Sequence, residues 1–411
     1  MSNMNRRCFL GSSAAAGAAL VGSLSRQAQA QVETAAAELT WGVPAGVRSY
    51  VKMGTLRGKK PLIQLTDRAP NYEAPLEYLR TPITPNDEFY VRYHLSDIPE
   101  VDVKAYKIAV GGDGANEQAV LTFEDLKKMA AVEVVAVNQY SGNRRGLSKP
   151  RVAGVQWGYG AMGCARWKGA RLKDILDKVG VKEDAIEIGL NGADGPAIDK
   201  TPDFIKSIPL WKAMDADTIV AYEMNGQPLP HFNGFPARLI VPGWTGTYWM
   251  KHLTNINVLT KPQGGFWMDA SYRIPVGKFP VVARFITQEH ATTTPITEMV
   301  VNSLITSHRD GDKVKAGEVT ISGLAWDGGY GIKAVEVSTD GGNSWSGARL
   351  GEDLGRYAFR PWSFVLMARP GKNGVMVNAS NKIGQSQIAE LIFNPAGYHN
   401  NVMQNITLIA S

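Results

Sequence analysis

The sequence predicts an α+β protein in which a region of mixed helices and strands is followed by a β-sandwich. In the middle of the chain, helical spacing alternates with short β-branched runs. From about residue 274 the pattern changes to alternating apolar and polar residues with Gly- and Asp-rich turns, and helical periodicity is scarce after residue 300. The chain has 411 residues, enough for two or three domains of ~100–200 residues each.

The mixed region contains two helical and two strand patterns. Thr122 precedes the segment 123–129, whose acidic first turn suits a capped short helix. The β-branched run 132–137 predicts a buried strand. Helical spacing over 172–179 then leads into a strand pattern over 186–190. These elements predict a layered arrangement with its own core.

The C-terminal part shows the period of half-buried antiparallel strands. Apolar and polar residues alternate over 334–338 and again over 375–379, and the glycine turn 340–342 follows the first of these runs. With turns of this kind between strands, a β-sandwich is the architecture expected for the last ~130 residues.

Charge and cysteine content exclude several function classes. The 44 basic and 38 acidic side chains give a net charge of +6, and three of the basic residues, Arg6, Arg7 and Arg26, fall in a leader, which leaves +3 for the remainder. This excess is too small to indicate nucleic-acid binding. Only Cys8 and Cys164 are present, so a disulfide framework or an all-cysteine metal centre cannot form. Redox chemistry would therefore need an imported cofactor.

Residues 1–30 are typical of an export signal. Arg6-Arg7 is followed by a small apolar run over 12–23 and by Ala28-Gln29-Ala30. Paired arginines with modest hydrophobicity favour the twin-arginine route over an ordinary secretory signal. The apolar run is shorter than a spanning helix requires, so we expect no membrane span. The expected location is the periplasm, and because folded, cofactor-loaded proteins use this route, a redox enzyme is the leading class.

A glycine motif at 158–163 matches the G-x-G-x-x-G pattern of dinucleotide-binding loops. The preceding segment 151–157 is a poor buried strand, and no acidic residue ends a second strand about 20 residues later. A structural glycine-rich turn is therefore the preferred interpretation, and a nicotinamide enzyme is a distant alternative.

Three separated segments concentrate Arg, His, Tyr and Trp. They are 89–94, 137–145 and 233–251. At strand spacing, Arg92 and His94 fall on one face, where a cation and an imidazole suit an anionic ligand. Any one of these segments could be structural, but together they indicate an anion or cofactor site.

In combination these segments resemble the sulfite oxidase family of molybdopterin enzymes, in particular periplasmic sulfite dehydrogenases. The similarity extends over nearly the whole mature chain and is carried by the residues 89–94, 138–145, 161–167, 221–230, 233–251, 323–332, 353–356 and 394–398. It implies a leader over 1–30, a mixed α/β molybdopterin-binding catalytic domain over 31–273 and an immunoglobulin-like dimerisation domain over 274–411. It also implies a molybdenum–molybdopterin cofactor, with sulfite or a similar small oxyanion as substrate.

No haem-attachment motif is present, so the resemblance implies electron transfer to a separate c-type cytochrome. The expected assembly is a homodimer, or a heterodimer with a cytochrome subunit.

The resemblance also implies roles for single residues. Arg92 and Arg145 would clamp the sulfite anion, and Tyr272 would be the active-site phenol. The residues implied to bind the cofactor are Tyr90, Val91, Arg92, Tyr93, His94, Asn233, Arg238, Trp249, Met250 and Lys251. Among these, Asn233 stands where some relatives have a histidine.

One position departs from the family pattern. The family has a cysteine after Gln139 as the protein ligand to molybdenum, and here that residue is Tyr140. Cys164 does not align with the missing ligand. A phenol is bulkier and harder than a thiol, and its reference pKa is ~10 against ~8.5 for cysteine.

Three readings of the metal site follow: Tyr140 ligates as a phenolate, the metal lacks a protein ligand, or the site is retained with altered or lost activity. The main prediction is a molybdopterin oxidoreductase that oxidises sulfite. Its alternatives are a cofactor-binding but catalytically silent protein and an enzyme of the same fold redirected to another substrate.

Overall fold

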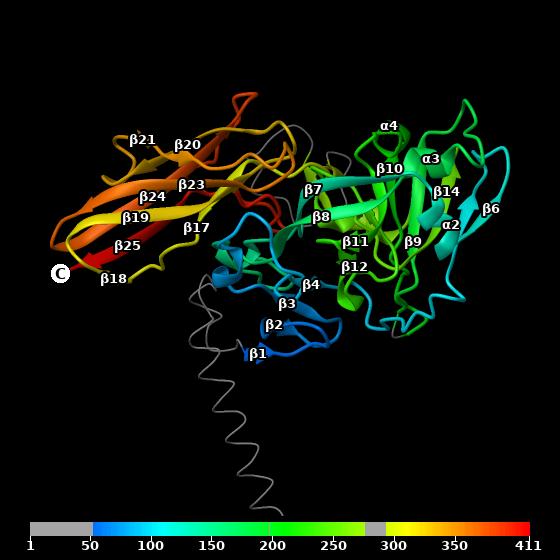
Figure 1. Ribbon diagram of the computed structural model, residues 1–411, viewed down its shortest axis with the longest axis horizontal. Coiled ribbons are helices and arrows are strands. Elements are labelled where there is room, and N and C mark those ends of the chain that lie inside the picture. The colour runs from blue at the N-terminus through cyan, green and yellow to red at the C-terminus, as the bar shows by residue number, and fades with distance from the viewer. Residues whose placement is uncertain (1–51, 197, 276–292) are drawn as a thin grey trace, which may run out of the picture.

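The computed structural model describes residues 52–196, 198–275 and 293–411, and these form two modules (Figure 1). A module of mixed sheets occupies one side of the molecule, and a β-sandwich occupies the other. The predicted leader, residues 1–30, lies outside the described residues. No helix in the described part of the chain is long and apolar enough to cross a membrane.

The N-terminal module is built on three sheets and a few short helices. An antiparallel sheet in the order β1-β2-β3-β4 comprises β1 (Lys52–Gly54), β2 (Leu62–Thr66), β3 (Asn71–Glu73) and β4 (Val91–Arg92). A five-stranded sheet in the order β10-β9-β14-β5-β6 comprises β5 (Lys107–Gly111), β6 (Ala119–Thr122), β9 (Glu187–Gly192), β10 (Lys206–Pro209) and β14 (Leu253–Leu259). The third sheet, in the order β12-β11-β8-β7 with β13 beside β11, comprises β7 (Ala131–Gln139), β8 (Met162–Arg171), β11 (Ile219–Met224), β12 (Gln227–Pro228) and β13 (Arg238–Ile240).

The helices of this module are α2 (Phe123–Lys128), α3 (Leu172–Leu176) and α4 (Leu210–Ala213). Helix α2 begins with the predicted Thr122 cap. The Thr122 side chain accepts a hydrogen bond from the Asp125 amide, and the Asp125 side chain accepts one from the Thr122 amide. Helix α3 is shorter than the predicted 172–179. A single π-turn covers Phe266–Ala270, and 3₁₀ turns cover Leu76–Leu79, Arg145–Leu147, His231–Asn233 and Gly246–Tyr248.

The predicted strand over 132–137 is present as β7, but it is buried only at its end. Val132 and Val135 are half-buried, whereas Ala136 and Val137 are fully buried. The reason is that β7 is the edge strand of its sheet, and only its last residues pass under the C-terminal module, where the Val137 amide bonds the Tyr357 carbonyl.

The C-terminal module is a sandwich of two sheets, as predicted. One has the order β17-β19-β23-β22 and comprises β17 (Asn302–Ile305), β19 (Gly317–Trp326), β22 (Arg349–Leu350) and β23 (Arg360–Ala368). The other has the order β18-β25-β24-β20-β21 and comprises β18 (Lys313–Val314), β20 (Ile332–Ser338), β21 (Ser346–Gly347), β24 (Gly371–Asn381) and β25 (Gln404–Ala410). A short ribbon of β15 (Arg273–Pro275) and β16 (Thr293–Pro295) leads into it.

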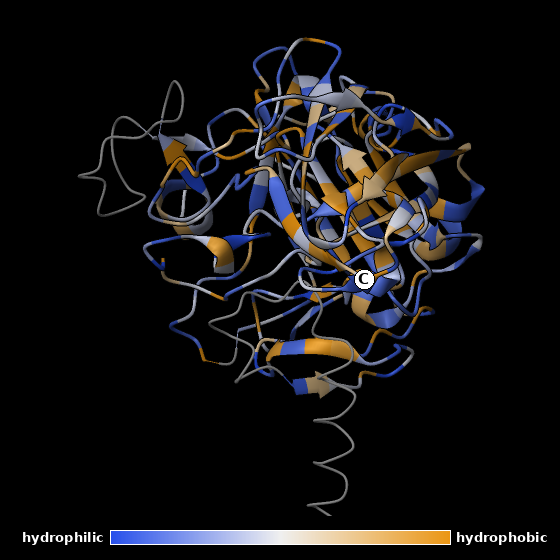
Figure 2. Cartoon of the chain, turned by 90° about the vertical axis from the view of Figure 1, so that its left-hand side faces the viewer, coloured by the Kyte–Doolittle hydropathy of each residue, from blue (hydrophilic) through white to orange (hydrophobic). Residues whose placement is uncertain are grey.

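The alternating residues of the sandwich face its core. Val337 pairs with Val377 across β20 and β24, and both side chains are buried in the cluster between the sheets. In Figure 2, orange apolar stretches lie mainly on the strands. Burial of one face of each sheet therefore explains the period of two seen in the sequence.

The two modules share an apolar contact. Val137, Met162 and Cys164 of the N-terminal module pack with Trp326 and Phe359 of the sandwich in one buried cluster. Cys164 is a free, fully buried thiol in this cluster, as expected for a small packed side chain. Because the contact is apolar and buried, it fixes the sandwich against the module that carries the site described below.

The glycine loop 158–163 binds a carboxylate of the protein itself. Glu73, 1% exposed, accepts hydrogen bonds from the amides of Gly158 (2.7 Å) and Gly160 (2.8 Å). An added Cβ at Gly160 would lie 1.8 Å from the Ala74 carbonyl, so the close approach requires glycine. The loop is therefore a structural turn, in agreement with the preferred reading of the motif.

Candidate active site

A pocket in the N-terminal module gathers the three Arg-, His- and Tyr-rich segments. Its space, including open solvent at the mouth, is about 540 Å³. The lining residues are Phe89, Tyr90, Arg92, Tyr93, His94, Asn138, Tyr140, Asp194, Phe204, Asn233, Arg238, Gly246, Thr247, Trp249, Met250 and Lys251. Nine of the ten residues implied as cofactor binders thus line one pocket.

Val91 is the exception, because its side chain does not line the pocket. Its side chain is 1% exposed and packs with Leu62, Tyr72 and Tyr93 on the other side of β4. Successive residues of a strand point to opposite faces, so a run of neighbouring residues cannot all face one ligand. Val91 therefore supports the wall of the pocket from behind.

One end of the pocket is strongly cationic. Arg238 donates to the Asn233 carbonyl (2.9 Å) and to the Trp249 carbonyl (3.1 Å), which ties together the two ends of the predicted segment 233–251. Lys251 donates to the Phe232 carbonyl (3.1 Å). Lys59 donates to the side-chain oxygen of Asn233, so it adds a third cation just behind the lining.

The pKa values at this end show that its positive charge is only partly offset by nearby carboxylates. Burial and the charge of Arg238 lower the pKa of Lys59 to about 7, although Asp87 raises it. Burial and the charge of Arg238 hold the pKa of Lys251 well below its usual range. Burial raises the pKa of Asp194, the carboxylate in the lining, to about 6. A cluster with this balance favours an anionic ligand, because the ligand would stabilise the charged lysines.

A second group of polar residues at the pocket is a set of phenols around Arg92. The Tyr272 hydroxyl lies 2.6 Å from Nε2 of His94 and 3.0 Å from the Tyr140 hydroxyl. Nη2 of Arg92 donates to Tyr272 (3.2 Å) and to Tyr140 (3.4 Å). The predicted substrate arginine, the predicted phenol and the position of the family's metal ligand are thus in mutual contact.

Tyr140 lies between two guanidinium groups. Arg92 and Arg145 are 4.7 and 5.9 Å from its ring centroid. Burial would raise the pKa of Tyr140, but Arg92, Arg145 and the hydrogen bonds from Tyr272 and Arg92 together lower it to about 7. The phenol at this position is therefore surrounded by groups that favour its ionised form.

Arg145 lies behind the pocket wall. Its Nε donates to the Ala396 carbonyl (2.7 Å) and its Nη1 to the Val155 carbonyl (3.3 Å). It is absent from the pocket lining, and its guanidinium faces the ring of Tyr140. The role in the anion clamp that the family resemblance implies for Arg145 stays a prediction.

Arg144 likewise turns toward the C-terminal module. It donates to the carbonyls of Val402 (2.9 Å) and Ser303 (2.7 Å), and its own carbonyl accepts from Asn400 (3.1 Å). Its φ of 67° lies in the left-handed region, which sends the two side chains in different directions. We call Arg144, Arg145 and the carbonyls that they bind the clasp.

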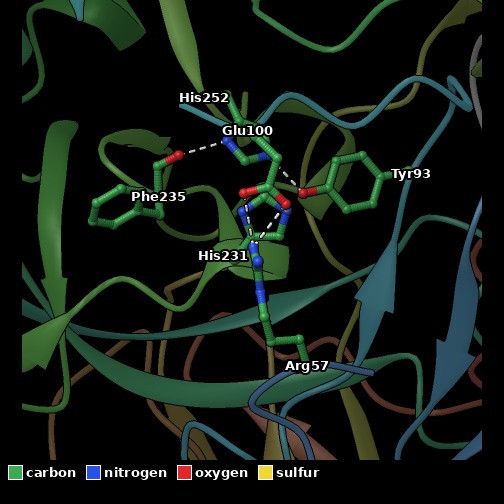
Figure 3. A network of polar contacts seen from close by, with 6 residues as sticks. All are labelled: Arg57, Tyr93, Glu100, His231, Phe235 and His252. Atoms are coloured by element: carbon green, nitrogen blue, oxygen red, sulfur yellow. Dashed lines mark hydrogen bonds and ion pairs between the residues drawn. The ribbon is translucent and has the colours of Figure 1, made fainter. Parts of the chain in front are cut away.

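A second layer of polar contacts supports the pocket wall at Tyr93 (Figure 3). The Tyr93 hydroxyl and Nε2 of His252 are 2.7 Å apart, and Nδ1 of His252 lies 2.6 Å from the Phe235 carbonyl. Because a carbonyl only accepts, Nδ1 carries the proton and Nε2 accepts from Tyr93. Farther out, His231 and Arg57 meet the exposed Glu100, so the network continues to the surface.

Sequence reasoning missed several lining residues. Asp194 and Phe204 belong to the segment between β9 and β10, and Gly246 and Thr247 belong to a 3₁₀ turn. A polar residue just after a strand was a usable signal for Asp194. Nothing in the sequence around Phe204 or Lys59 points to a site, since both reach it through folding alone.

The pocket fits an anionic cofactor in two further respects. Nε of Arg92, Nδ2 of Asn138 and Nε of Arg238 are buried and have no hydrogen-bond partner within the described residues. At Gly246 an added Cβ would come within 2.8 Å of the Asn138 side-chain oxygen, so only glycine leaves this part of the wall open. Buried donors without partners are costly unless a ligand satisfies them.

This fold and this site define a molybdopterin-dependent oxidoreductase. A family model of the oxidoreductase molybdopterin binding domain matches residues 94–267, and one of the Mo-co oxidoreductase dimerisation domain matches 293–410. Human mitochondrial sulfite oxidase is 36% identical over 317 residues, which is 74% of this chain and 57% of the human protein. The Arabidopsis thaliana sulfite oxidase is 33% identical, with 76% of this chain and 81% of the plant protein covered. The chain belongs to the sulfite oxidase family.

A solved structure shows the same architecture. The sulfane dehydrogenase SoxCD from Paracoccus pantotrophus is similar with a TM-score of 0.73 and 26% identity, over 89% of this chain and 90% of that one. The resemblance inferred from the sequence is therefore confirmed, as are the α+β fold and the molybdenum–molybdopterin cofactor. The chain spans 57% of the length of the human relative.

Proposed function

We propose that this protein oxidises sulfite to sulfate and passes the electrons to a c-type cytochrome. The observation that carries the proposal is the buried pocket, which combines a cluster of cationic side chains with the contact of Arg92, Tyr140 and Tyr272. Sulfite and water give sulfate with loss of two protons and two electrons, and the molybdenum–molybdopterin group supplies this redox step when bound.

The protein's own residues bind the cofactor and position the anion. Arg238, Lys251 and Lys59 form the cationic end and would hold the cofactor phosphate, where guanidinium and ammonium donors suit phosphate oxygens. Arg92 would hold a sulfite oxygen. The Tyr272 hydroxyl orients Arg92 by accepting from its Nη2 and could also form a hydrogen bond with the anion. Arg145 acts from behind, through its charge on Tyr140.

The place of action that we propose is the periplasm. It rests on the twin-arginine pattern at Arg6-Arg7. The absence of a haem-attachment motif in the sequence supports a separate cytochrome as acceptor. The match to a dimerisation domain over 293–410 supports a dimer, with or without a cytochrome subunit.

The first experiment is metal and pterin analysis of the exported protein together with sulfite:cytochrome c activity on the same sample. Stoichiometric molybdenum with turnover is the expected result, and it would show that Tyr140 is compatible with catalysis. Molybdenum without turnover would favour the catalytically silent reading. Protein free of molybdenum would contradict the proposed function.

A Tyr140→Cys variant sharpens this test. A thiolate is a softer ligand than a phenol, so sulfite turnover is expected to rise about tenfold, or ~1.4 kcal/mol in the barrier. Tyr222→Cys is a suitable control because Tyr222 is also buried but lies outside the pocket lining. Unchanged turnover in a metal-replete Tyr140→Cys protein would mean that other features of the site have diverged.

A second candidate is the oxidation of a sulfane sulfur. It is favoured by the similarity to sulfane dehydrogenase SoxCD, which covers 89% of this chain, and by the unusual Tyr140. Turnover of a sulfane substrate without sulfite oxidation in a molybdenum-replete sample would decide for this candidate.

A further inference from the structure

Tyr398 is a residue of the C-terminal module that lies against the catalytic centre of the other module. It is 3% exposed and ends the segment 394–398, between β24 and β25. It is absent from the pocket lining and from the site residues that the family resemblance implies, although the segment 394–398 is one of those that carry the resemblance. Its neighbours are nevertheless two of the three residues predicted to be catalytic.

The first neighbour is Tyr272. The two rings are stacked, with centroids 5.6 Å apart and an angle of 18° between their planes. The Ser271 side chain and the Tyr272 backbone lie near enough to the Tyr398 hydroxyl to lower its pKa, against the larger rise caused by burial. Tyr398 therefore contacts both the ring and the backbone of the residue whose hydroxyl meets Arg92, His94 and Tyr140.

The second neighbour is Arg145. Its guanidinium carbon lies 5.3 Å from the centroid of the Tyr398 ring, and its Nε donates to the Ala396 carbonyl, two residues earlier (2.7 Å). The same guanidinium faces the ring of Tyr140. One segment of the sandwich module thus fixes the charge behind Tyr140 and the phenol beside it.

The segment is itself held firmly. The Asn394 side chain donates to the Tyr398 carbonyl (2.8 Å) and accepts from the Tyr398 amide (3.0 Å). Gly397 has a φ of 62°, and an added Cβ there would lie 2.9 Å from Cγ of Arg145. Glycine at this position lets the segment approach Arg145 closely.

Tyr272 needs such support because its backbone is strained. Its φ of 60° lies in the left-handed region, which is unfavourable for a bulky side chain and persists only where surrounding contacts enforce it. Lys206, 5.5 Å from the ring centroid, and Trp267, 6.2 Å from it, border the ring elsewhere, while Tyr398 provides the stacked face.

We propose that Tyr398 is a positioning residue of the active site: it holds the Tyr272 phenol against Arg92 and the Arg145 guanidinium against Tyr140. The C-terminal module is then a structural part of the catalytic centre as well as a dimerisation module. The proposal rests on the proposed function only where sulfite turnover is the readout.

The test compares Tyr398→Leu, Tyr398→Phe and the control Tyr357→Leu in molybdenum-replete protein. Tyr357 is also a buried tyrosine of the C-terminal module that contacts the N-terminal one, at Lys212 and Gly243, but it does not line the pocket. The measurements are kcat and KM for sulfite and the Kd for sulfate by calorimetry, which does not depend on turnover.

Tyr398→Leu is expected to lower kcat/KM roughly tenfold to a hundredfold and to raise the sulfate Kd by at least about fivefold. Tyr398→Phe keeps the stacking and is expected to recover most of this, with the sulfate Kd raised only about twofold to threefold for the lost hydroxyl. Tyr357→Leu is expected to leave both quantities within about twofold of the wild type. If Tyr398→Leu does not fold, the comparison of Tyr398→Phe with Tyr357→Phe carries the test.

Unaltered sulfate affinity in both Tyr398 variants would overturn the inference. An equal loss in the Tyr357 control would also overturn it, because the effect would then belong to module contact in general. A wild type that binds sulfate but does not oxidise sulfite contradicts the proposed function alone, and the sulfate affinities still decide the role of Tyr398. A wild type that does neither contradicts both proposals.

Discussion

The pocket and the clasp both contain buried arginines, but these arginines have different hydrogen-bond partners. In the clasp, Arg144 and Arg145 direct their donors to backbone carbonyls of the sandwich module. In the pocket, Arg92 faces two phenols and leaves its Nε without a partner within the described residues. Nε of Arg144 also lacks a partner among the described residues, so the difference lies in the acceptors: carbonyls of the other module in the clasp, and phenol hydroxyls beside a cavity in the pocket.

The same contrast separates the pocket from the glycine loop 158–163. Both offer donors suited to an anion, but the loop is filled by the carboxylate of Glu73. In the pocket, burial lowers the pKa values of Lys59 and Lys251, and Asp87 and Asp194 offset this only in part. Internal compensation therefore distinguishes a structural anion contact from a ligand site here.

The largest expected effect is on the clasp. Arg144→Met leaves the Val402 and Ser303 carbonyls without their donor, and the free energy of unfolding is expected to fall by about 2–5 kcal/mol. Chemical denaturation measures this loss, with Arg151→Met, an exposed arginine, as the control. Unchanged stability together with a loss of bound cofactor would show that Arg144 serves the pocket and would break the comparison.

The next effect concerns the glycine loop and depends on pH. Burial raises the pKa of Glu73 to about 7 from 4.5, so the native state binds its proton more tightly than the unfolded state does. Its contribution to stability is thus complete below pH 4.5 and is lost as the pH rises to about 7, a change of up to about 3 kcal/mol.

Glu73→Gln removes this titration. The difference in unfolding free energy between the wild type and the variant should therefore change across that pH window and stay constant above it. Denaturation curves at several pH values measure it, and Glu124→Gln, at an exposed carboxylate in α2, serves as the control. A constant difference across the window would show that Glu73 is ionised throughout.

A smaller effect is expected for Lys251→Met, which should stabilise the cofactor-free protein but weaken cofactor binding. In cofactor-free protein, removal of one buried cation relieves repulsion and desolvation, and stability is expected to rise by about 1–4 kcal/mol. In exported protein, molybdenum content is expected to fall because a phosphate partner is lost. Thermal unfolding tests the predicted gain in stability, and metal analysis tests the predicted loss of molybdenum. A destabilised cofactor-free variant would contradict the prediction that the buried charge of Lys251 is unfavourable.

The smallest effect is expected at the outer end of the network in Figure 3. Arg57 and Glu100 form an exposed pair, 63% and 73% accessible, and such pairs add little because solvent screens them. Arg57→Gln should therefore leave both the unfolding midpoint and the cofactor content unchanged. A loss of cofactor would show that the network transmits its state to Tyr93 and the pocket.

The order and type of the modules could be predicted because they rest on local patterns. The alternation around Val337 and Val377 requires a sheet with one buried face, and Thr122 caps a helix wherever that helix packs. Strand spacing likewise placed Arg92 and His94 on the pocket side, and the structure has both beside Tyr272.

Other features could not be predicted because they depend on long-range packing. Only the fold reveals that Val91 points away, that Lys59 reaches Asn233 and that Asp194 closes the lining. The prediction that the early part of β7 is buried was wrong for the same reason, since the strand's own residues do not show that it lies at the edge of its sheet.

The sequence by itself determined the family, the cofactor and the departure at Tyr140, because these depend on which residues stand in which order. The tertiary structure alone decided the direction of each arginine and the partner of the glycine loop. The reason is physical: a guanidinium or a row of amides binds whichever acceptor folding brings within reach. For Arg145 that acceptor is the Ala396 carbonyl, which comes from the other module.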